Sequence, residues 1–81
     1  MGDKVTLLPP DDEQLSFASE VNAKLGSETK VSFYRIGAED GVQYGVVFQY
    51  GNICRKNMTS DVPWHDVDEM VADVQRWVRM L

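Results

Sequence analysis

Residues 42–52 read VQYGVVFQYGN, and their side chains alternate with a period of two. In an extended strand, successive side chains point to opposite faces. One face therefore carries the apolar row Val42, Tyr44, Val46, Phe48 and Tyr50. Because a half-buried antiparallel strand alternates in this way, we expect the row to be the core-facing floor of a sheet and not an open binding platform.

Two further strands flank this segment. Residues 30–36 (KVSFYRI) are rich in β-branched and aromatic residues, and residues 53–58 (ICRKNM) form a weaker candidate strand. The turn signal Asp40-Gly41 separates the first two strands, and Gly51-Asn52 separates the last two. The sequence therefore predicts a three-stranded antiparallel meander.

The segment before the strands, residues 11–26, predicts an amphipathic helix. Asp11 is a suitable cap, Gln14 follows three positions later as in a capping box, and Gly26 supplies a stop. The expected apolar stripe has Phe17 at its edge and consists of Leu15, Ala18, Val21 and Leu25.

A second helix is expected within residues 60–81. Its first residue is left open, because Ser60, Asp61 and Asp66 can each act as a cap. The apolar residues recur at helical spacing and form one broad face, made of Trp64, Val67, Met70, Val71, Val74, Trp77, Val78 and Leu81.

This order of elements predicts an α+β fold, a two-layer sandwich of α-β-β-β-α order with both helices on one face of the meander. Residues 11–81 form a single domain. Residues 1–10 are a flexible arm or, through Val5 and Leu7, a short edge strand that Pro9-Pro10 ends.

The uncovered face of the sheet is the candidate interaction surface. Val47 and Gly45 lie on it, opposite in parity to the aromatic row, and Gly45 leaves a dent or marks a bulge. The strand register stays open at this point. A two-residue Asp40-Gly41 turn places Phe33 opposite Phe48 on the helix side, whereas a five-residue loop reverses the faces. The exposed apolar residues are therefore either Tyr34 with Ile36 or Val31 with Phe33.

The charge balance opposes nucleic-acid binding. Thirteen acids against eight bases give a net charge of −5, and affinity for nucleic acid comes mostly from neutralising phosphates. Double-stranded-RNA-binding domains share the α-β-β-β-α order and place lysines around the start of their second helix. Here residues 65–71 read HDVDEMV at that position, and element order alone does not transfer function.

No catalytic, cofactor or metal site is predicted. Cys54 is the sole cysteine and His65 the sole histidine, and no third group orients them as an activated pair. The acidic runs at residues 11–13 and 66–69 lack the spacing of a calcium loop and fit helix starts. The first residues contain no apolar run long enough for a signal peptide or a membrane span, so we expect a soluble cytoplasmic protein.

The leading hypothesis is a small acidic, non-enzymatic protein-interaction module. It would bind a protein partner, or dimerise, through the uncovered sheet face or a strand edge. The alternative is an inhibitor that mimics nucleic-acid charge, such as an antagonist encoded by a mobile element, through an acidic surface made of Asp66, Asp68, Glu69 and Asp73.

Overall fold

The computed structural model describes residues 5–81. Residues 1–4, part of the predicted arm, lie outside the described residues. The elements follow one another as β1 (Thr6–Leu8), α1 (Asp12–Lys24), β2 (Thr29–Ala38), β3 (Gly41–Tyr50), β4 (Cys54–Ser60) and α2 (Val67–Arg79).

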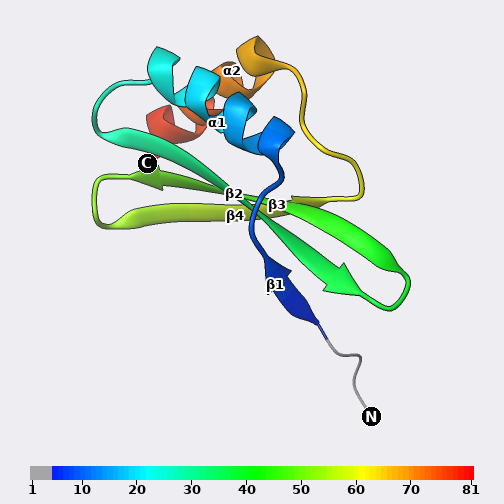
Figure 1. Ribbon diagram of the computed structural model, residues 1–81. Coiled ribbons are helices and arrows are strands. Elements are labelled where there is room, and N and C mark those ends of the chain that lie inside the picture. The colour runs from blue at the N-terminus through cyan, green and yellow to red at the C-terminus, as the bar shows by residue number, and fades with distance from the viewer. Residues whose placement is uncertain (1–4) are drawn as a thin grey trace.

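The two helices pack on one face of a four-stranded antiparallel sheet (Figure 1). The strand order is β1-β2-β3-β4, so the strands are neighbours in the same order as along the chain. The predicted two-layer α+β fold is confirmed, with the meander as β2, β3 and β4. The optional edge strand near the N-terminus is β1, which pairs with the far end of β2.

Only the middle of the apolar row of β3 is buried in the core beneath the helices. Val46 and Phe48 are buried, whereas Val42 is 42% exposed. Figure 1 shows the reason: the β2–β3 hairpin projects beyond the helices, so its tip has no helix to cover it. The Phe48 and Trp77 rings lie 5.9 Å apart between centroids, which places both residues in one core as expected.

The register of the β2–β3 hairpin decides which face each side chain occupies. Ala38 pairs with Gly41, so the two-residue turn is Glu39-Asp40, and Gly41 adopts a φ of 138°. The predicted turn position was therefore wrong by one residue, and Phe33 pairs with Val46 instead of Phe48. Moving the two-residue turn by one position shifts the pairing of β2 with β3 by two residues. Each side chain therefore stays on the face of the sheet that a two-residue turn predicts. The five-residue loop and its reversed faces are excluded.

The predicted stripe of α1 is confirmed at Val21, with Ala18 and Leu25 packed against the core, but not at Leu15. Leu15 is 53% exposed, while Gln14, Phe17 and Val21 are buried. The Phe17 ring packs edge-on against Phe33 at 5.6 Å, and the Gln14 side-chain amide donates to the Trp64 carbonyl at 3.0 Å. The larger Phe17 side chain therefore packs between α1 and the sheet, and Leu15 lies towards solvent.

Of the three residues that could cap the second helix, the structure uses the last, so the helix begins at Val67. Asp66 is the cap, since its carboxylate accepts from the Glu69 backbone N–H at 3.1 Å. Trp64 therefore precedes the helix, and its inclusion in the apolar face of that helix was wrong. Trp64 still packs on the core, with its ring 5.8 Å from that of Phe33, because the loop lays it across α1.

Candidate functional site

The four predicted surface residues lie together on the sheet face that no helix covers, here called the outer face. Tyr34 pairs with Gly45 across β2 and β3, and Val47 is two residues further along β3. Ile36 pairs on its other side with Leu7 of β1, which is 73% exposed. Cross-strand partners share a face of the sheet. The outer patch is defined as Leu7, Tyr34, Ile36 and Val47.

Gly45 is neither a dent nor a bulge. Pairing continues through it on both sides, to Tyr34 and to Thr59. The Tyr34 ring lies directly over it, so that a methyl group added at Gly45 would overlap the ring. The Tyr34 hydroxyl donates to the Asn57 side-chain oxygen on β4. The expected dent is therefore filled by a ring that ties β2 to β4 across the outer face.

The outer face carries no carboxylate within the strands that the structure describes. Its charged side chains are Lys30 of β2 and Arg55 of β4, which lie at the same end of the sheet with Gln49 between them. Most of the acids instead precede or lie in the two helices. Asp61, which follows β4, reaches the margin of this face, where its carboxylate accepts from the Gln43 side-chain amide at 3.2 Å. The strands themselves present no outward carboxylate, in a protein of net charge −5.

The side of β2 away from β3, where the short strand β1 is the edge strand of the sheet, is closed along most of its length. β1 covers residues 35–37. Beyond β1, the Asn22 side chain brackets Val31: its oxygen accepts from the Val31 N–H at 2.8 Å and its amide donates to the Val31 carbonyl at 3.0 Å. The Thr29 N–H donates to the Gly26 carbonyl at 3.0 Å. A side chain and a loop therefore supply the hydrogen bonds that another strand would make.

The opposite edge, formed by β4, is open. In residues 5–81 no backbone hydrogen bond joins β4 to anything but β3. A groove of about 250 Å³ lies next to it, between β4 and α2. Its apolar lining is Phe48, Met58, Trp77 and Met80, and its charged lining is Lys56, Asp73 and Arg76.

Three of the four carboxylates of the predicted acidic surface interact with other groups of the protein. Asp68 pairs with Lys24 at 3.2 Å, Asp73 pairs with Arg76 at 3.1 Å, and Asp66 caps α2. Glu69 lies in the first turn beside them. Both ion pairs are exposed and contribute little to stability, but each places a cation beside a carboxylate. The structure does not show a line of free acids here.

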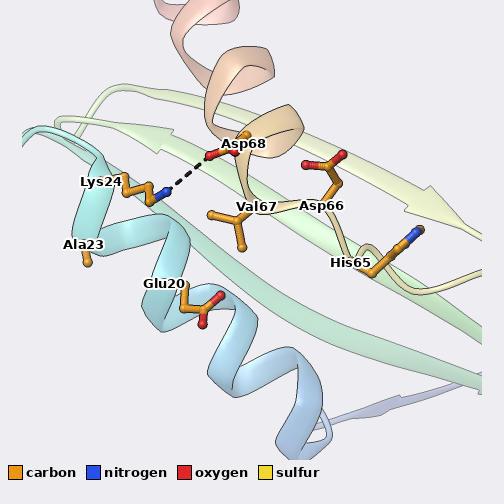
Figure 2. A pocket seen from close by; sticks show the side chains of 7 residues that line it. All are labelled: Glu20, Ala23, Lys24, His65, Asp66, Val67 and Asp68. Atoms are coloured by element: carbon orange, nitrogen blue, oxygen red, sulfur yellow. Dashed lines mark hydrogen bonds and ion pairs between the residues drawn. The ribbon is translucent and has the colours of Figure 1, made fainter.

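Figure 2 shows a cleft between α1 and the start of α2, with the Lys24–Asp68 pair across its upper part. Glu20 and His65 are at its rim, and the His65 ring points away from Lys24. Cys54 lies at the start of β4 and is not among the residues of this cleft. Among residues 5–81, no three histidine, cysteine or acidic side chains gather as metal ligands.

One titratable group in the described chain has a clearly displaced pKa. A hydrogen bond to Glu28, reinforced by the negative charge of that carboxylate, raises the pKa of the Tyr50 phenol above its ordinary value of 10.0. The side chain is half-buried at the end of β3, beside the turn in which the Gly51 N–H donates to the Glu28 carbonyl at 2.8 Å. This contact joins the loop before β2 to the β3–β4 turn, away from the cleft.

The chain matches no protein-family model, no curated protein and no solved structure. No helix within residues 5–81 is long and apolar enough to cross a membrane. The functional argument therefore depends on the surfaces themselves.

Sequence reasoning missed two residues at these surfaces. Leu7 was considered only as part of an edge strand, although its pairing with Ile36 extends the outer patch. Asn22 gave no signal at all, because an asparagine on a helix does not indicate which strand edge it meets. The basic character of β4 was visible in the sequence, since Arg55 and Lys56 are adjacent and lie on opposite faces of the strand.

Proposed function

We propose that this protein is a non-enzymatic protein-binding module that associates with a second copy of itself through the outer face. The observation that supports the proposal is a contiguous apolar patch on strands whose outward side chains include no carboxylate, in a chain whose net charge is −5. Contiguous exposed apolar surface marks interaction sites more often than isolated apolar residues do.

Charge favours a second copy as the occupant of this face. When two outer faces meet, the two acidic helix layers lie on opposite sides of the pair and are separated by two sheets. An arrangement that brings the helix layers of two copies together would place carboxylates against carboxylates, which costs free energy. Face-to-face packing of sheets is also a common way to bury apolar strand faces.

The test replaces Val47 by lysine. Val47 is half-buried on the outer face and has no place in the helix-side core. We expect Val47→Lys to change the free energy of unfolding by only about 0.5 kcal/mol, as at ordinary surface sites. Sedimentation velocity should show association weakened by about tenfold or more, because the ammonium group would be desolvated in the interface.

The matched control is Gln49→Lys, on the same strand and the same face, two positions away. It adds the same charge without removing a member of the outer patch, and it should weaken association less. A wild-type protein that sediments as a monomer at every concentration would refute self-association. Unfolding of Val47→Lys would instead show that this face is essential to the monomer.

The alternative, a nucleic-acid-mimicking inhibitor, has less support. It needs a spaced line of free carboxylates, whereas Asp68 and Asp73 have cationic partners and Asp66 caps α2. Competition with DNA for a common partner that weakens steeply with added salt is the measurement that would favour it.

A further inference from the structure

We propose that the open edge of β4, together with the groove between β4 and α2, binds an extended acidic peptide segment as a fifth strand. The inference concerns a different surface from the outer patch and stands whether or not the protein self-associates. Its starting point is the contrast between the closed edge of β2 and the open edge of β4.

The backbone of β4 supplies the first part of such a site. Its seven residues, Cys54–Ser60, pair with β3 on one side, and in the described chain nothing pairs with them on the other. The outward N–H and C=O groups can therefore form a ladder with a peptide. This mode of binding obtains affinity from main-chain hydrogen bonds and selectivity from pockets for alternate side chains.

The groove supplies the pocket. Met58 points to the helix side of β4, opposite Val46, and lines the groove with Trp77 and Met80. Met80 is 76% exposed just beyond the end of α2 and can contact a peptide side chain in the groove. An added strand would direct every second side chain to this face. One apolar side chain of the peptide would thus lie against Met58 and Met80.

Charge determines the class of peptide. Arg55 and Lys56 are adjacent and exposed on β4, and the structure shows no ion pair for either. They flank the strand edge from opposite faces, with Lys56 on the groove side and Arg55 on the outer face. Arg76 also lines the groove, where Asp73 is its partner. The charged lining of the groove is two cations, Lys56 and Arg76, against one carboxylate, Asp73. Electrostatic interactions at physiological salt decay over about 8 Å, so these local groups outweigh the acids of the helix starts. The edge therefore favours carboxylates and disfavours lysines in its partner.

The probe is a blocked, fluorescein-labelled heptapeptide in which glutamate alternates with valine and a central phenylalanine. Two twins serve as controls: one with lysine in place of every glutamate, and one with N-methyl groups on alternate amides, which removes ladder donors. Fluorescence anisotropy with the full-length chain should show binding of the acidic peptide. Both twins should bind more weakly by about tenfold or more, from like-charge contact and from lost hydrogen bonds respectively.

The protein variants locate the site. Arg55→Glu with Lys56→Glu should reverse the preference, so that the lysine twin binds more tightly than the acidic peptide. The matched control, Lys24→Glu with Lys30→Glu, makes the same change in net charge on α1 and β2 and should retain the preference for the acidic peptide. Amide shifts in a ¹⁵N spectrum should move at residues 54–60 and in the last turn of α2.

Three results would each overturn the proposal. They are no binding of the acidic peptide at low ionic strength, equal binding of the acidic peptide and its lysine twin, and equal effects of the two double variants. Val47→Lys should leave peptide binding unchanged, so failure at the β4 edge is distinguishable from failure of self-association through the outer patch.

Discussion

The two edges of the sheet are built in opposite ways. The β2 edge is covered by β1 at residues 35–37 and bracketed by Asn22 at Val31. The β4 edge has no covering element in the described chain and lies beside an apolar groove with a basic rim. An exposed strand edge invites pairing with another chain, and natural proteins block edges that they do not use. The contrast is the basis of the proposal that β4, and not β2, pairs with a partner strand.

The largest effect is expected from truncating Phe48, a core side chain of the strand that lies between β2 and β4. Phe48 on β3 pairs with Val31 on β2 and with Lys56 on β4, and its ring packs near Trp77. We expect Phe48→Ala to lower the free energy of unfolding by roughly 3–5 kcal/mol, which is most of the stability of so small a domain. Urea denaturation followed by circular dichroism measures the change.

Val42→Ala is the matched control for Phe48→Ala. It truncates an apolar side chain on the same face of the same strand, but beyond the helices, where Val42 is 42% exposed. Its cost should be about 0.5 kcal/mol. Similar melting of Phe48→Ala and wild type would mean that the two edges do not share this core.

An intermediate effect is expected from opening the closed edge. Asn22→Ala removes both hydrogen bonds to Val31, whose N–H and C=O would then lie unpaired beside a buried side chain. We expect a loss of about 1–3 kcal/mol, the usual cost of unsatisfied buried polar groups. Hydrogen exchange should show that the Val31 amide loses protection.

Asn52→Ala, in the exposed β3–β4 turn, is the control and should be close to neutral. Should the Val31 amide of Asn22→Ala stay as protected as in wild type, the β2 edge is closed by something other than Asn22, and the contrast between the edges loses its main support.

The smallest effect is expected from breaking the Tyr34–Asn57 hydrogen bond, which links β2 to β4 across the outer face. Gly45→Ala would push the Tyr34 ring away and break its hydrogen bond to Asn57. We expect a cost of about 0.5–1.5 kcal/mol, that of one hydrogen bond. Because Tyr34→Phe removes the same bond, the two changes should be less than additive in a double-mutant cycle.

Gly26→Ala is the control for Gly45→Ala, since an added methyl group at Gly26 meets nothing within 4 Å. Full additivity of Gly45→Ala and Tyr34→Phe would show that the ring does not rest on Gly45 in solution.

The amino-acid sequence alone determined the secondary structure and the inward side of β3. The alternation from Val42 to Tyr50 is a local pattern, so it predicts the two faces of the strand without knowledge of the rest of the chain. The same holds for Asp11, which caps α1 as predicted, and for the apolar spacing of α2. Two amphipathic helices and one sheet then leave few arrangements other than two layers.

Only the tertiary structure decided the register, the buried stripe of α1 and the contrast between the edges. Each depends on contacts between residues distant in the sequence: Asn22 with Val31, Tyr34 with Asn57, and Gln14 with Trp64. Leu15 and Phe17 both fit an apolar stripe, and the Phe33 ring across the interface selects Phe17. Local periodicity predicts which side of a helix or strand is apolar. Packing between elements determines which other element that side contacts.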